Sequence, residues 1–253
     1  EANRAFRWLK APRKTGTICR LSTHVIVGNV YLEAYARRFT PEVTVIPTTI
    51  DTQRYLPKSD VEIDGRPVIG WSGSFSTLKH LQTALPALRR LRRSVDFRLK
   101  VIGPPCALEG LDLERVAWDP RGEVEALKTF DIGLMPLPDD PGARGKCGLK
   151  ALQYMALGIP TVASPVGVNR EIIQDGSNGF LASSESEWVE KLSALLSRPD
   201  LRRRFAQAGR VTVETEYSAS AQAPRLMQIL ERVCGASAAS VGVGAREPVG
   251  AAG

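Results

Sequence analysis

The sequence has little of what metal-binding and disulfide-rich proteins need. Its 253 residues include only four cysteines and two histidines. The cysteines are far apart and form no C-x-x-C pair, and no H-E-x-x-H occurs. These absences argue against a zinc site, a histidine-centred catalytic triad and a disulfide framework. We therefore expect reduced thiols and no bound metal.

Long apolar runs are missing as well. No stretch approaches the ~18 apolar residues of a membrane-spanning helix, and the first residues lack the apolar centre of a signal peptide. We therefore expect a cytoplasmic protein. Hydrophobic residues make up 43% of the chain and charged residues 24%, a composition that supports a sizeable folded core.

The formal net charge of +7 favours a partner that carries phosphate, which leaves nucleic acid, an anionic membrane and a nucleotide open. Familiar nucleotide motifs are absent. Lys146 is followed by Cys147, and residue 140 is Asp140, so there is no Walker P-loop. No G-x-G-x-x-G follows an expected strand. ATP hydrolysis and dinucleotide-dependent redox chemistry are thus unsupported.

From about residue 67, short apolar runs alternate with longer helical patterns. The runs are rich in branched residues and bounded by Gly or Pro, which predicts strands. Alternating strands and helices predict an α/β protein with a parallel sheet and helices on both faces. Ligands of such sheets bind at the carboxyl ends of the strands. The expected strands cover residues 67–71, 97–103, 116–118, 132–137 and 160–164.

The first 57 residues fit this pattern poorly. They contain an expected strand at 23–28, a helix at 31–38 and a strand at 43–47, which together are too little to bury a core of their own. We interpret residues 1–57 as the remnant of a neighbouring N-terminal domain with a connector.

The main domain is expected to cover residues 58–234. It should end in three helices over residues 185–233, with breaks near 198–199 and 217–218. Residues 235–253 are small and show little periodicity, which predicts a disordered tail.

The segment 144–158 has an unusual distribution of charge. A helix should run from Gly148 to about residue 157, with Lys146, Lys150 and Gln153 on one face. Arg144, Lys146 and Lys150 cluster at its start without a single acid, although cations there oppose the helix dipole. A bound anion would reverse the sign of that effect. The alternative is a solvated basic helix face.

A similar arrangement follows an earlier strand. The loop 73–77 is small and rich in hydroxyl groups, and Lys79 and His80 fall in the first turn of the next helix. The loop either binds an anion or only caps the helix through Ser76 or Thr77. Two basic helix starts on one edge of a sheet would suit a diphosphate.

One helix carries a cluster of four arginines, at positions 89, 90, 92 and 93. No recognised nucleic-acid motif accompanies them, so we expect no nucleic-acid partner. They form either a solvated face or a peripheral contact with an anionic membrane.

Several blocks together resemble the nucleotide-sugar-binding half of retaining GT-B glycosyltransferases of family 4, from about residue 20 to 233. The residues of these blocks are most similar to those of a bacterial subgroup linked to surface-polysaccharide synthesis. The resemblance implies two Rossmann-like domains, a nucleotide-sugar donor, no metal or other cofactor, and a glycan or lipid-linked acceptor handled at the inner face of the membrane. The blocks are VIPTTID (45–51), VIGWSGSFST (68–77), FDIGLMPLP (130–138), RGKCGLKALQYMALGIPTVASPVGVNREII (144–173) and DGSNGFL (175–181).

The chain departs from the family pattern in two places. The family has two glutamates eight positions apart, of which the second meets the donor ribose, whereas this chain has Gly145 and Gln153. The amide of Gln153 is still able to bond a hydroxyl group. In the phosphate loop, Ser74 stands at the arginine position and Lys79 at the lysine position.

Sugar transfer places negative charge on the departing diphosphate, which cations and backbone amides stabilise. We expect Lys79, Lys146 and Lys150 to be catalytic. A truncated, non-catalytic nucleotide-sugar-binding module is the alternative, because acceptor machinery is largely missing. The expected substrate-binding residues are Gly73, Ser74, Thr77, Arg144, Gly148, Leu149 and Gln153.

Overall fold

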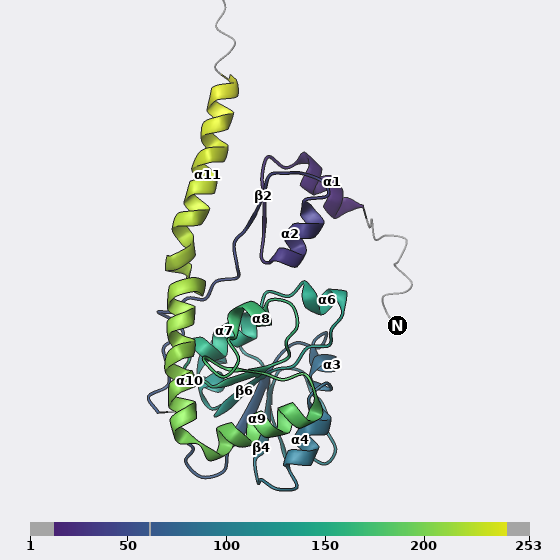
Figure 1. Cartoon of the computed structure of the whole chain (residues 1–253), viewed down its shortest axis with the longest axis vertical. Helices are drawn as coiled ribbons and strands as arrows, with labels where there is room; N and C mark the ends of the chain where they lie inside the picture. Colours follow the sequence, from purple (N-terminus) through teal and green to yellow (C-terminus); the bar gives the residue numbers. More distant parts are fainter. Residues whose placement is uncertain (1–12, 61, 242–253) are drawn as a thin grey trace, which may run out of the picture. The chain divides into compact units, whose positions relative to one another are not determined.

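The computed structural model describes residues 13–60 and 62–241, with side chains up to residue 235 (Figure 1). The chain divides into two compact units. One contains the described residues up to Ile46 together with those from Gln222 on, and the other is Pro47–Ala221. The division therefore falls after Ile46, whereas the sequence predicted a boundary after residue 57. The described residues of 222–234, expected in the main domain, belong to the first unit.

The first unit contains a strand, helix and strand close to the predicted positions. β1 (Val25–Val27) and β2 (Val43–Val45) pair in parallel, and α2 (Val30–Ala36) connects them. The side chain of Asn29 caps α2 by accepting a hydrogen bond from Leu32 N at 2.9 Å. A preceding helix, α1 (Lys14–Leu21), was not predicted.

The second unit contains a six-stranded sheet in which every pairing is parallel, in the order β5-β4-β3-β6-β7-β8. This confirms the predicted fold class. The strands are β3 (Val68–Ser72), β4 (Arg98–Ile102), β5 (Leu113–Val116), β6 (Ile132–Met135), β7 (Thr161–Ala163) and β8 (Phe180–Leu181).

Two strands differ from the prediction. β5 lies at Leu113–Val116 and not at 116–118, because two adjacent charged residues, Glu114 and Arg115, interrupt the apolar pattern of this edge strand and hide its start. β8, on the opposite edge, has only two residues and carries no pattern of its own.

Helices cover both faces of the sheet, because strand side chains alternate between two hydrophobic clusters (Figure 1). Ile69 and Leu134 belong to the cluster with Leu88 and Trp188, while Met135 belongs to the other with Leu152. The short and intermediate helices are α3 (Leu78–Leu81), α4 (Leu85–Leu91), α5 (Glu123–Lys128), α6 (Pro141–Arg144), α7 (Leu149–Ala156) and α8 (Asn169–Ile172).

The C-terminal helices break where the sequence predicted. α9 (Glu185–Ser197) begins at a capping box on Ser184. α10 (Pro199–Thr212) has proline at its first position and continues as a π-helical turn, η1 (Val213–Tyr217). α11 spans Ala219–Val241. The predicted disordered tail is therefore wrong for residues 235–241, where alanines favour a helix; residues 242–253 lie outside the described residues.

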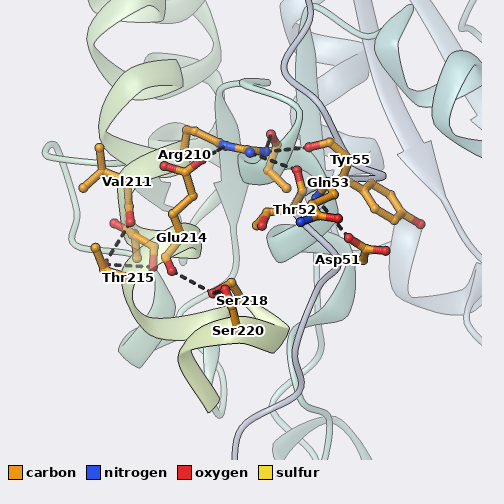
Figure 2. A network of polar contacts seen from close by, with 12 residues as sticks. Asp51, Thr52, Gln53, Tyr55, Arg210, Val211, Glu214, Thr215, Ser218 and Ser220 are labelled. Atoms are coloured by element: carbon orange, nitrogen blue, oxygen red, sulfur yellow. Dashed lines mark hydrogen bonds and ion pairs between the residues drawn. The ribbon is translucent and has the colours of Figure 1, made fainter. Parts of the chain in front are cut away.

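Arg210 on α10 attaches the connector after Ile46 to the second unit (Figure 2). Its Nη1 donates hydrogen bonds to the carbonyls of Tyr55 at 2.5 Å and Ala156 at 2.8 Å. Its Nη2 donates to the carbonyl of Thr52 at 3.0 Å, and its Nε pairs with Glu214 at 2.6 Å. This network joins the connector to α7 and α10 of the second unit. A separate hydrogen bond from the Tyr55 hydroxyl to Glu123, at 2.8 Å, holds Tyr55 at the start of α5.

Candidate nucleotide-sugar site

A cavity of about 740 Å³ lies at the carboxyl edge of the six-stranded sheet. Its walls come from the loops after four adjacent strands, β5, β4, β3 and β6, and from the start of α7. This is where a parallel sheet is expected to bind its ligand. The cavity brings together seven of the ten predicted site residues, namely Gly73, Ser74, Lys146, Gly148, Leu149, Lys150 and Gln153.

Gly148 shapes the start of α7. It occupies the N-cap position with a φ of 72°, which is left-handed backbone that favours glycine. A Cβ at this position would lie 2.3 Å from Cδ1 of Ile172. No side chain caps the helix, and its first turn contains no acid. The backbone amides at the start of α7 are therefore open to an anionic group from outside the chain.

Lys150 lies in the first turn of this helix and is partly buried. Its Nζ is 5.9 Å from the centre of the Trp71 ring. Burial, and secondarily the charge of Lys146, lowers the pKa of Lys150 to about 8. Within the described chain, Lys150 forms no ion pair with a carboxylate. An anion in the cavity would supply the missing countercharge.

The three predicted catalytic lysines all affect the pKa of one residue, His80. His80 is buried, and its burial lowers its pKa, as do the charges of Lys146, Lys79 and Lys150. All three lysines are thus close enough to one imidazole to affect it. Lys79 itself is exposed on α3 and is not among the residues that line the cavity.

The loop after β3 is held mainly by its own hydrogen bonds. The hydroxyl of Thr77 accepts from Ser74 N at 2.9 Å and donates to Ser74 O at 3.1 Å. Thr77 is buried outside the cavity lining, so its hydroxyl shapes the loop. Ser74 is exposed and does line the cavity.

Arg144 also lies outside the cavity lining. It ends α6, where its guanidinium binds both carboxylate oxygens of Asp139, at 2.6 and 3.0 Å. The hydrogen bonds and charge of Arg144 lower the pKa of Asp139. Arg144 therefore already has an anionic partner within the chain.

A chain of hydrogen bonds crosses the cavity wall from α7 to the end of β5. Gln153 Nε2 donates to the Tyr55 hydroxyl at 2.9 Å, and that hydroxyl donates to Glu123 Oε2 at 2.8 Å. The indole of Trp118 donates to Glu123 Oε1 at 2.9 Å. Burial raises the pKa of Tyr55, which keeps its hydroxyl protonated as a donor. Sequence reasoning missed Tyr55, Trp118 and Glu123, because no local motif marks them.

The arginine cluster of α4 is largely engaged with other parts of the chain. Arg89 donates to the carbonyl of Glu109 at 3.0 Å, Arg90 pairs with Glu185 at 3.6 Å, and Arg92 pairs with Asp96 at 2.5 Å. Each of these exposed contacts contributes only about 0–1 kcal/mol, so the pairs hold the arginines weakly.

In the part of the chain that the structure describes, no group of three or more His, Cys, Asp or Glu side chains gathers in a way that could hold a metal ion. None of the described helices combines the length and the apolar character needed to cross a membrane.

The parallel sheet and its cationic cavity define a Rossmann-like domain suited to a phosphate-bearing ligand. Residues 66–198, more than half of the chain, match the family Glycosyl transferases group 1. The chain therefore belongs to the group 1 glycosyltransferase family.

Among curated proteins, the phosphatidyl-myo-inositol mannosyltransferase of Mycobacterium tuberculosis is 26% identical. The match covers 84% of this chain and 61% of that relative. The chain thus spans about three-fifths of the length of the mannosyltransferase it matches.

Two solved structures share the fold. Sucrose-phosphate synthase from Thermosynechococcus elongatus matches with a TM-score of 0.71 and 18% identity, over 88% of this chain and 61% of that one. The Anabaena protein HepE, crystallised with UDP and glucose, matches with a TM-score of 0.73 and 15% identity, over 87% and 66%.

Proposed function

We propose that this chain is the donor-binding part of a GT-B glycosyltransferase of family 4, which transfers a sugar from a nucleotide-diphosphate donor to a glycan or lipid-linked acceptor. The observation that carries the proposal is the start of α7. There an uncapped helix, a left-handed glycine and the partly buried Lys150 all border one cavity. A diphosphate would neutralise the lysine and accept hydrogen bonds from the helix amides.

The charge of the lysines supports a role in the chemical step. When the bond between the sugar and the diphosphate breaks, negative charge grows on the departing oxygen. Lys150 and Lys146, with the amides at Gly148 and Leu149, would stabilise that charge from positions set before the reaction begins. Lys79, which is exposed beside them, would add a weaker long-range attraction.

The finer features of the reaction belong to the same proposal. We propose that the transfer retains the anomeric configuration and that the lysines stabilise the leaving group without a metal ion. We also propose that the enzyme works in the cytoplasm, in surface-polysaccharide or glycoconjugate synthesis, with peripheral contact to an anionic membrane. The name of the mycobacterial relative, which refers to phosphatidyl-myo-inositol, supports a lipid-linked acceptor.

A binding and turnover assay with one panel of ligands tests the proposal. UDP, GDP, ADP and their common sugar conjugates are titrated into the chain. Release of the nucleoside diphosphate is then followed with each sugar donor, with water as the acceptor of the sugar. We expect one base to bind with a dissociation constant in the micromolar to millimolar range. Failure of every nucleotide and of inorganic pyrophosphate to bind would refute a donor site in this cavity.

A further inference from the structure

A second cavity, of about 490 Å³, lies within the first unit, between α1 and the end of α2 (Figure 1). Three arginines line it, Arg13, Arg20 and Arg38, together with the rings of Tyr35 and Phe39. None of the described residues that line it is acidic. A cavity of this size with such walls is suited to a small anionic group.

The cavity lies away from the edge of the sheet where substrates are expected. α2 connects β1 to β2, and these strands are parallel, so the helix begins at the carboxyl end of β1 and ends near the amino end of β2. Tyr35, Arg38 and Phe39 come from that end of α2 and the turn after it. Parallel sheets bind their substrates at the opposite, carboxyl edge. A ligand of this cavity would therefore be additional to those of the reaction.

The guanidinium groups of the cavity have no acidic partner within the chain. Arg13, Arg20 and Arg38 are exposed, and among the described residues none of them forms an ion pair. Arg37 provides a contrast, because its Nε and Nη2 bind the carboxylate of Glu33 at 3.0 and 2.6 Å. Two adjacent arginines thus differ, one satisfied by its own helix and one directed to the cavity.

The two aromatic rings hold the arginines in place. The guanidinium carbon of Arg20 lies 5.6 Å from the centre of the Phe39 ring. That of Arg38 lies 5.8 Å from the centres of both Tyr35 and Phe39. Gly16 lets this ring pack on α1, because a Cβ there would lie 2.6 Å from it. A guanidinium that stacks on a ring keeps its N–H groups available for a ligand.

A phosphate group fits this arrangement better than a carboxylate. Arg20 and Arg38 share the ring of Phe39, so they lie close together and repel each other. An anion between them would replace repulsion with attraction. The guanidinium fork matches two phosphate oxygens, and a phosphomonoester carries a charge of about −1.5 to −2 at a pH of about 7.

We propose that Arg20 and Arg38 bind a phosphate group in this cavity, with Arg13 adding positive charge. The phosphate is presented either by a soluble phosphomonoester or by the headgroup of an anionic lipid. Ile18 and Leu21, on the same helix, are 54% and 81% exposed and would enter the interface of a membrane that presents the headgroup. The inference does not depend on nucleotide binding at α7.

Calorimetric titration of the whole chain with glycerol 3-phosphate tests the soluble source. Arg20→Ala and Arg38→Ala remove the proposed contacts, and both side chains are exposed, so the variants should fold. Arg93→Ala is the matched control, because it removes the same charge from an exposed position in the second unit. Lys150→Met weakens anion binding at α7 and so separates the two cavities. Thermal unfolding of each variant verifies that it is folded.

Vesicles test the lipid source. Binding to vesicles of phosphatidylglycerol and phosphatidylcholine in equal amounts is compared with binding to phosphatidylcholine alone, by co-sedimentation of the same variants. Leu21→Ser is added, since it removes an exposed apolar side chain and no charge. If the headgroup is the source, Leu21→Ser should weaken binding to the anionic vesicles about fivefold and leave glycerol 3-phosphate unaffected. If the source is soluble, glycerol 3-phosphate binds and neither vesicle does.

With either source, Arg20→Ala and Arg38→Ala should each weaken the probe that binds by about tenfold, as expected for the loss of a charge-assisted contact. Arg93→Ala and Lys150→Met should keep the affinity of this site within about twofold. Failure of both probes to bind the wild type would overturn the inference. So would binding that is unchanged in folded Arg20→Ala and Arg38→Ala, or that only Lys150→Met removes.

Discussion

Two basic helix starts border the same edge of the sheet, and they differ in capping and in the burial of their lysines. At the start of α7, Gly148 leaves the first turn uncapped, and among the residues that the structure describes the partly buried Lys150 forms no ion pair with a carboxylate. At the start of α3, Thr77 uses its hydroxyl within the loop, and Lys79 points to solvent. Similar charge patterns in sequence thus correspond to one site with unmet interactions and one that is largely satisfied by its own chain.

The difference matters because unmet interactions are what a ligand gains. A cation that burial has partly stripped of water attracts a diphosphate more strongly than one surrounded by solvent. An exposed lysine is screened by salt within about 8 Å at physiological ionic strength. We therefore expect the start of α7 to contribute more to binding of a diphosphate than the start of α3.

The largest effect is expected for Lys150→Ala. Loss of a well-placed donor to developing negative charge costs about 2.7–4 kcal/mol of the barrier, so nucleoside diphosphate release should slow about 100–1,000-fold. Steady-state turnover with the preferred sugar donor checks this value. Lys128→Ala, a lysine paired with Glu125 on α5, is the control and should leave turnover unchanged. A change of less than a few-fold in Lys150→Ala would remove the lysine from the catalytic group.

The second effect is a pH dependence of donor binding. Lys150 has a pKa of about 8, so it loses its proton and charge as the pH rises through that value. The diphosphate prefers the charged lysine, and its affinity should fall about tenfold between a pH of about 7 and about 9. Calorimetry across this range measures the fall. Lys150→Met should bind weakly at every pH with a flat profile, and a persistent fall in that variant would assign the titration to another group.

The third prediction concerns the backbone at the start of α7. Gly148→Ala should lower the free energy of unfolding by about 1–3 kcal/mol, since its Cβ meets Ile172 and its φ is 72°. Gly176→Ala is the matched control, with a similar φ of 77° but open space around the added carbon. Denaturant titration of both variants separates strain from packing. Equal losses would show that the contact with Ile172 contributes nothing.

The smallest effects are expected at the two predicted cations outside the cavity lining. Lys79→Ala should weaken donor binding by no more than about threefold, because the lysine acts through solvent. Arg144→Ala removes an exposed pair with Asp139 and should change both affinity and stability by little, as exposed pairs contribute about 0–1 kcal/mol. An effect in Lys79→Ala as large as in Lys150→Ala would erase the contrast between the two helix starts.

Much of the fold follows from local pattern. Buried parallel strands such as Val68–Ser72 consist of short apolar runs bounded by turn residues, so their existence and approximate positions are predictable. The edge strands are less visible, because Leu113–Val116 mixes polar with apolar residues and Phe180–Leu181 is too short for a period. The helical residues 235–241 were missed because small residues without periodicity also occur in helices.

In the candidate site, too, some residues are predictable from local sequence patterns and others are not. The cations around Gly148 are found from sequence because their spacing and the lack of acids are local features. The contact between Tyr55 and Glu123 joins residues that are 68 positions apart in the sequence, and no local pattern in either segment predicts it. The sequence also does not reveal that the guanidinium of Arg144 pairs with Asp139, or that the hydroxyl of Thr77 bonds to the backbone of its own loop. Which groups are already satisfied is a property of the folded chain.

The position of a bound diphosphate tests the central claim most directly. A crystal structure of the chain with its preferred nucleoside diphosphate should place phosphate oxygens within hydrogen-bond distance of the amides that follow Gly148 and of Lys150 Nζ. A nucleotide bound with its phosphates away from the start of α7, and with Lys150 still lacking an anionic partner, would contradict the account.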